Sequence, residues 1–98
     1  MEISLNRDGE KLTICVAGRM DTSTAPKLDS CIDENIEGVS ELTFDLKELS
    51  YTSSAGLRVF LKAQKLMNRQ GKMKLVNVQK DVMEIFEITG FTEILDIE

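Results

Sequence analysis

An Asp8-Gly9 pair near the start of the chain lies between two runs in which apolar and polar residues alternate, residues 3–5 and 12–16. An Asp-Gly pair in this setting favours a tight hairpin, because the type I′ turn needs positive φ at both central residues. We therefore predict that the first two strands pair antiparallel and that Gly18 ends the second. An opening hairpin of this kind rules out a sheet whose strands are all parallel.

The middle of the chain changes between helical and strand spacing. Residues 22 to about 36 carry apolar side chains at three- and four-residue intervals, with Pro26 in the first turn, which predicts a helix. Residues 41–46 alternate and predict a strand, and residues 47–52 predict a loop. A broad apolar face over residues 54–70 predicts a second, longer helix.

The last third of the chain predicts three short elements. Residues 73–78 show little alternation and indicate a strand buried on both faces, residues 82–86 a short helix closed by Gly90, and residues 94–97 a last short strand. Helices between strands favour parallel pairing through right-handed crossovers. We therefore predict one α/β domain over residues 1–98, with element order β-β-α-β-α-β-α-β. Its mixed sheet of four or five strands has helices packed against it.

Charge and composition exclude several functions. The chain has 12 basic and 17 acidic residues, a net charge of −5, and no His. That balance argues against a protein that binds nucleic acid by neutralising phosphates. Without His, and with two cysteines in no CxxC pair, we expect no metal site. No apolar run is long enough to cross a membrane and the start of the chain is not a signal peptide, so we expect a cytoplasmic protein without a membrane partner.

Motifs for catalysis are also missing. The sequence has no glycine-rich phosphate loop and no GxSxG motif, so we expect no cofactor and no enzyme activity. One alternative is an enzyme or small-ligand module in which Ser53 or Ser54 acts as nucleophile with a lysine base. No lysine lies near these serines in the sequence.

One segment combines hydroxyl and small side chains at the start of the second predicted helix, Tyr51-Thr52-Ser53-Ser54-Ala55-Gly56-Leu57-Arg58. Helix capping alone explains the Ser and Thr residues. It does not explain Gly56, which weakens a helix and commonly allows a close approach to the backbone. An accessible serine here is also a good phosphoacceptor, because the helix dipole stabilises the added charge and Arg58, four residues beyond Ser54, could reach it.

A second segment, Gly18-Arg19-Met20-Asp21-Thr22-Ser23, lies where the second strand meets the first helix. Taken alone, Asp21 fits a carboxylate that caps a turn as well as a functional group. The two segments share an edge of the sheet only if the strand order brings the second strand beside the third. The sequence leaves that order open.

With these motifs the chain resembles a STAS domain of the single-domain anti-sigma factor antagonist type, over residues 3–97. The Ser-Ser-Ala-Gly-Leu-Arg stretch is the most specific of them. The segments that carry the resemblance are Gly18-Arg19-Met20-Asp21, Leu42-Thr43-Phe44-Asp45-Leu46, Leu49-Ser50-Tyr51-Thr52-Ser53-Ser54-Ala55-Gly56-Leu57-Arg58, Gly71-Lys72 and Ile88-Thr89-Gly90-Phe91.

The resemblance implies the STAS fold and a partner-switching role. Family members bind a serine-kinase anti-sigma factor of the GHKL type and release a sigma factor; phosphorylation breaks the complex and a PP2C-type phosphatase restores it. The family's phosphoserine falls on Ser54, and Ser53, where the family often has Asp, is a competing acceptor. The implied partner-binding residues are Asp21, Thr22, Ser23, Thr52, Ser53, Ser54, Ala55, Gly56, Leu57 and Arg58.

An alternative within the same family is a STAS scaffold subunit that is never phosphorylated, in a signalling or lipid-transport assembly. The serine in place of Asp before Ser54 leaves room for it. In either role we expect a monomer that dimerises at most weakly.

Overall fold

The computed structural model describes residues 1–98, the whole chain. It has five strands, three α-helices and one 3-10 helix, which confirms the α/β class and the mixed sheet. The elements in chain order are β1 (Glu2–Asp8), β2 (Lys11–Met20), α1 (Ala25–Asn35), β3 (Glu41–Asp45), β4 (Leu49–Thr52), α2 (Ser54–Gln70), β5 (Lys72–Val76), α3 (Lys80–Thr89) and η1 (Phe91–Glu93).

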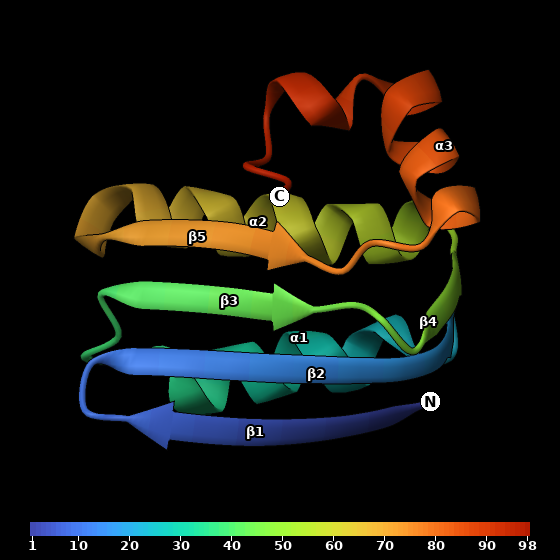
Figure 1. Cartoon of the computed structure of the whole chain (residues 1–98). Helices are drawn as coiled ribbons and strands as arrows, with labels where there is room; N and C mark the ends of the chain where they lie inside the picture. The colour runs from blue at the N-terminus through green and yellow to red at the C-terminus, as the bar shows by residue number, and fades with distance from the viewer.

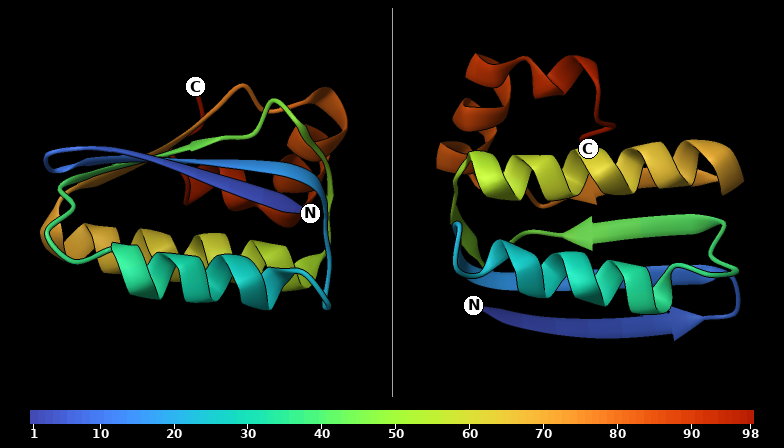
Figure 2. Two further views of the ribbon diagram at one scale, coloured as in Figure 1. Left: turned by 90° about the horizontal axis from the view of Figure 1, so that it is seen from below. Right: turned by 180° about the vertical axis from the view of Figure 1, so that it is seen from behind.

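The sheet runs in the order β1-β2-β3-β5, with β1 antiparallel to β2 and the other neighbours parallel (Figure 1). Helices α1 and α2 lie side by side on one face of this sheet (Figure 2). Buried and accessible residues alternate along β2, β3 and β5. The sheet therefore has one face covered by helices and one open face.

The hairpin prediction is confirmed, but the turn differs from the expected type. Asp8 still pairs with Lys11, so Gly9 and Glu10 form the turn. Gly9 has φ +62° and Glu10 is not among the residues with positive φ. Positive φ at the first central residue alone is the pattern of a type II′ turn, in which glycine takes that position.

Strand β2 is longer than predicted because it pairs with two strands in succession. Its first half pairs with β3, and its last residues, from Gly18 to Met20, pair with β4 across a register shift. Gly18 has φ +97° at this irregularity and does not end the strand. The loop predicted over residues 47–52 is wrong for its last four residues, which form β4.

Two predictions at the C-terminal end of the chain are also wrong. Strand β5 alternates between exposed and buried residues, because no layer covers the open face of the sheet. No strand forms over residues 94–97: the 3-10 helix η1 ends just before them at Glu93, and only Ile97 makes a single bridge, to Leu75. The short third helix is present as α3, and Gly90 ends it with φ +81° as predicted.

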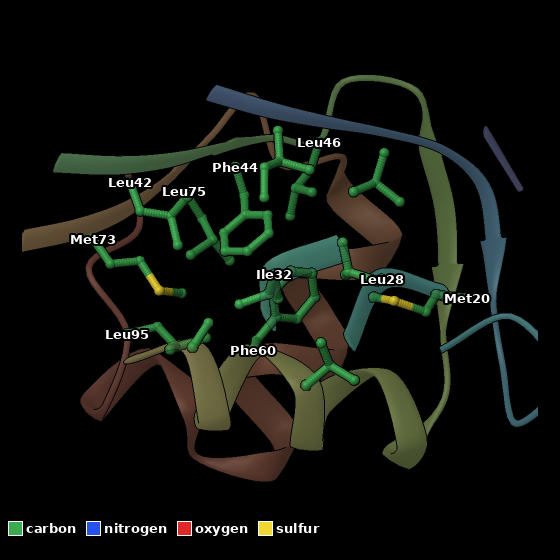
Figure 3. Packing of buried hydrophobic residues seen from close by; sticks show 14 of the residues in the cluster. Met20, Leu28, Ile32, Leu42, Phe44, Leu46, Phe60, Met73, Leu75 and Leu95 are labelled. Atoms are coloured by element: carbon green, nitrogen blue, oxygen red, sulfur yellow. The ribbon is translucent and has the colours of Figure 1, made fainter. Parts of the chain in front are cut away.

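The space between the sheet and the helices is filled by one cluster of 22 buried apolar residues (Figure 3). Phe60 of α2 lies at its centre, with ring centroids 5.1 Å from Phe44 and 5.9 Å from Phe86 in edge-to-face contacts. Truncating a buried aromatic side chain of this kind costs about 3–5 kcal/mol. Helix α2 is therefore held tightly against β3 and α3, and this packing fixes where its N-terminus lies.

Candidate functional site

Strands β2 and β4 end side by side, so the strand order brings the two predicted segments to the same edge. Met20 is the register partner of Thr52, and the Ser53 N–H donates a hydrogen bond of 2.8 Å to the Met20 carbonyl oxygen. The N-termini of α1 and α2 both start at this edge (Figure 1). Main-chain hydrogen bonds therefore fix the position of one segment relative to the other.

Asp21 organises the turn between β2 and α1. Its Oδ1 accepts hydrogen bonds from the Ser23 N–H at 2.9 Å, the Ser23 hydroxyl at 2.7 Å and the Thr24 N–H at 3.2 Å. These bonds occupy residues 21–24 in a turn, so α1 begins at Ala25 instead of near Thr22 as predicted, and no hydroxyl caps it. The hydrogen bonds from Ser23, then those from Thr24, lower the pKa of Asp21 below its ordinary value.

This lowered pKa predicts a pH dependence of stability. Because the pKa is depressed in the folded state, the carboxylate stabilises the fold above the unfolded-state value of about 3.9, and the gain is lost as pH falls through the folded value. We expect Asp21→Asn to lower stability at pH 7 and to match the parent protein at pH 2, measured by urea unfolding. Asp96→Asn, at an exposed carboxylate that accepts no hydrogen bond, is the control. An equal deficit at both pH values would contradict this role.

The two serines at the start of α2 differ in accessibility. Ser53 takes the N-cap position with extended backbone, yet its hydroxyl makes no capping bond, and its Oγ is buried without any hydrogen-bond partner. The capping explanation of this hydroxyl is therefore wrong. Ser54, the first residue of the helix, is exposed.

The unpartnered hydroxyl of Ser53 leads to a prediction about stability. A buried polar group without a hydrogen bond costs about 1–3 kcal/mol. We expect Ser53→Ala to keep the free energy of unfolding or raise it by about 1 kcal/mol, although Ala is usually a poor N-cap residue. Chemical denaturation measures the change, with Ser54→Ala as the exposed control. A clear loss of stability in Ser53→Ala alone would show that the hydroxyl has a partner in solution.

Gly56 lets α2 approach the ends of β2 and β4 closely. A Cβ atom at this position would overlap the Thr52 Oγ1 atom and lie 2.8 Å from the Met20 Cε atom. The close approach that the sequence indicated is therefore made by the chain itself, not by a ligand. Gly56 keeps the first turn of α2 against the two strand ends that carry the candidate residues.

The predicted partner-binding residues divide by exposure. Thr52, Gly56 and Leu57 are buried and support the edge from below. The members that reach the surface are Asp21, Thr22, Ser23, Ser53, Ala55, Ser54 and Arg58, of which Thr22, Ser23, Ser54 and Arg58 are exposed. Thr22, Ala55 and Arg58 share the walls of a shallow groove of about 370 Å³ between α1 and α2. Side chains of both segments thus form one continuous surface.

One contact at this edge was not predicted from the sequence. The Arg19 guanidinium lies 4.3 Å from the ring centroid of Tyr51, a cation–π contact between β2 and β4. Because the sequence predicts a loop over residues 47–52, it does not indicate that these two side chains face each other. The contact extends the edge on the side of β4.

The serines at this edge have no catalytic base beside them. Neither the Ser53 nor the Ser54 hydroxyl has a side-chain base within hydrogen-bonding distance, and a serine nucleophile needs one. No group of three or more acidic or cysteine side chains could hold a metal ion. No helix is long and apolar enough to cross a membrane.

Comparison with known proteins shows the family. The family model of the STAS domain matches residues 2–98. The chain belongs to the STAS domain family. The anti-sigma-B factor antagonist of Listeria monocytogenes is 38% identical over 104 residues, covering 100% of this chain and 90% of that protein. The anti-sigma-B factor antagonist of Bacillus subtilis is 31% identical over 98 residues, covering 99% and 90%.

The solved structures agree with the STAS fold described above. The unphosphorylated form of the anti-sigma factor antagonist SpoIIAA superposes with a TM-score of 0.85 at 19% identity, covering 99% of this chain and 88% of that one. At this identity the similarity shows the fold. The sheet with α1 and α2 on one face is therefore the arrangement of the STAS fold.

Proposed function

We propose that this STAS domain is an anti-sigma factor antagonist. It binds a serine-kinase anti-sigma factor through the edge formed by residues 21–23 and 53–58, and phosphorylation of Ser54 ends the complex. The observation that carries the proposal is the exposed Ser54 on this edge, in a chain whose relatives are named anti-sigma-B factor antagonists. SpoIIAA, which shares the fold, has been solved in an unphosphorylated and a phosphorylated form.

The chemistry of the edge supports Ser54 as the acceptor in preference to Ser53. The Ser53 Oγ atom is buried, so a kinase cannot reach it without opening the start of α2. A phosphate on Ser54 brings about −1.5 to −2 charges at pH 7. The dipole of α2 stabilises this charge, and Arg58 lies one turn further along the same helix.

The phosphate on Ser54 weakens the complex, even though the helix dipole stabilises its charge on the free protein. In a complex the phosphate must lose its water, and Asp21, ionised at neutral pH, already places a negative charge at this edge. A partner surface complementary to the unphosphorylated edge is therefore repelled after phosphorylation. No change of conformation is required for this switch.

A phosphorylation assay tests the proposal. The kinase-type anti-sigma factor encoded in the same genome is incubated with ATP and the parent protein, Ser54→Ala or Ser53→Ala, and intact mass is measured. We expect one phosphate on the parent and on Ser53→Ala and none on Ser54→Ala, with removal by a PP2C-type phosphatase. Equal labelling of Ser54→Ala would refute the site, and no binding of the anti-sigma factor would refute the function.

One observation favours a second candidate. Ser53 stands where the family often has Asp, so a charge that could guide a kinase is missing. A STAS scaffold subunit that is never phosphorylated would need no such charge. Intact-mass analysis of the protein from its native cells separates the two, because a scaffold would carry no phosphate under any growth condition.

A further inference from the structure

Helix α2 carries a set of positive charges, of which the switch at Ser54 uses only Arg58. Although the whole chain has a net charge of −5, the 17 residues of α2 include four basic and no acidic side chains. The four are spaced at intervals of four, three and four residues, which puts them on one side of the helix. We call them the α2 basic stripe: Arg58, Lys62, Lys65 and Arg69.

Only one cation of the α2 basic stripe is neutralised. The Lys62 ammonium lies 2.6 Å from Asp29 Oδ1 and 2.9 Å from Asp33 Oδ1, both on α1. Arg58, Lys65 and Arg69 form no ion pair anywhere in the structure. Like charges at three- and four-residue spacing destabilise a helix. The helix dipole favours Arg69 in the last turn, but it does not remove the repulsion among the unpaired cations.

The α2 basic stripe also has an apolar component. Leu61 and Leu66 are only half-buried. Together with the four cations they line a shallow groove of about 290 Å³. From Arg58 to Arg69 the helix rises about 16 Å, so the groove can take a segment of a few residues in extended form or about three helical turns.

We propose that the α2 basic stripe binds an acidic segment of the anti-sigma factor, one that presents Asp or Glu side chains to the cations and an apolar side chain between Leu61 and Leu66. This inference rests on the proposed function and names the chemistry of the partner. Arg58 lines both the groove between the starts of α1 and α2 and the groove along α2, so the two surfaces are continuous. The partner would thus contact α2 over most of its length.

The neighbouring helix argues for a narrow protein segment and against an anionic membrane. Helix α1 lies beside α2 on the same face of the domain (Figure 2). It carries Asp29, Asp33 and Glu34 against one lysine. A flat anionic surface would meet both helices and be repelled by α1, whereas a single chain segment can follow α2 alone.

Paired charge variants test this proposal through binding to the anti-sigma factor of the same genome. Lys65→Glu/Arg69→Gln removes the charge from the stripe, and the control Lys72→Gln/Lys74→Glu makes the same net change on the open face of the sheet. At low salt we expect the stripe variant to bind about tenfold more weakly and to lose most of its salt dependence. The control should change affinity by less than about twofold.

A melting curve excludes loss of the fold as the cause. Because Lys65→Glu replaces repulsion with Lys62 by attraction, while Arg69→Gln loses a cation favoured by the helix dipole, the stripe variant should melt close to the parent. Equal weakening by both variants would show a general charge effect and overturn the proposal. So would tight binding of the parent to phosphatidylserine vesicles with unchanged binding of the variant to the anti-sigma factor.

The same binding assay also distinguishes failure of the stripe proposal from failure of the proposed anti-sigma factor antagonist function. If Ser54→Glu abolishes binding while the stripe variant binds like the parent, the stripe proposal is overturned and the proposed function stands. If the parent does not bind the anti-sigma factor at all, both are overturned.

Discussion

Ser54→Glu should weaken binding of the anti-sigma factor by about a hundredfold or more, a loss of about 3 kcal/mol. The glutamate places a charge at the exposed start of α2, on the edge where Asp21 is already ionised. In the complex that charge must lose its water and lie against a surface of the anti-sigma factor that is complementary to the neutral Ser54 hydroxyl. Because a phosphate carries about twice the charge, the phosphorylated protein should bind more weakly still. Isothermal titration calorimetry measures both.

The matched variant at the same position is Ser54→Ala. It removes the hydroxyl without adding charge, so we expect nearly parental affinity together with resistance to the kinase. Circular dichroism should show both variants folded, since an exposed side chain in a first helical turn is changed. Parental affinity in Ser54→Glu would contradict the idea that charge at this edge is the switch.

Gly56→Ala should destabilise the protein by about 1–3 kcal/mol, the cost of overpacking a filled site. In an exposed helix the same change stabilises by up to about 1 kcal/mol. Overpacking and helix propensity therefore predict opposite signs for the change in stability. Here the added methyl group would overlap Thr52 Oγ1 and crowd Met20. Urea unfolding measures the difference.

The same substitution should also reduce binding of the anti-sigma factor. Moving the first turn of α2 away from β2 and β4 strains the hydrogen bond from the Ser53 N–H to the Met20 carbonyl, which joins the two candidate segments. Ser54→Ala, two residues away, is the control and should unfold like the parent. A more stable Gly56→Ala would mean that α2 can shift without loss, contrary to the close packing described above.

The sequence predicted the elements whose pattern is local. Helix α2 was expected over residues 54–70 and is found at Ser54–Gln70, because a long apolar face and an ending glycine determine it. Strand β4 was missed, since four residues are too short for a clear alternation. The two-sided burial expected for β5 failed because coverage of a strand face depends on where the helices pack.

The same distinction holds for the candidate site. The hydroxyl-rich segment and Asp21 were recognisable from residue type and from the family resemblance. Their shared edge depends on β2 pairing first with β3 and then with β4, a long-range choice that no local pattern encodes. The buried Ser53 Oγ and the contact of Arg19 with Tyr51 depend on that same pairing.

The continuous pairing of β2 with β3 and β4 has a kinetic consequence. Because backbone hydrogen bonds hold both halves of the edge in one rigid frame, the surface is ready before any partner arrives. Association should then be limited by diffusion and orientation, at about 10⁵–10⁷ M⁻¹s⁻¹, with no slow ordering step. Phosphorylation would then act mainly by raising the dissociation rate constant of the complex. The exchange of one partner for another on this domain would be limited by dissociation of the first partner.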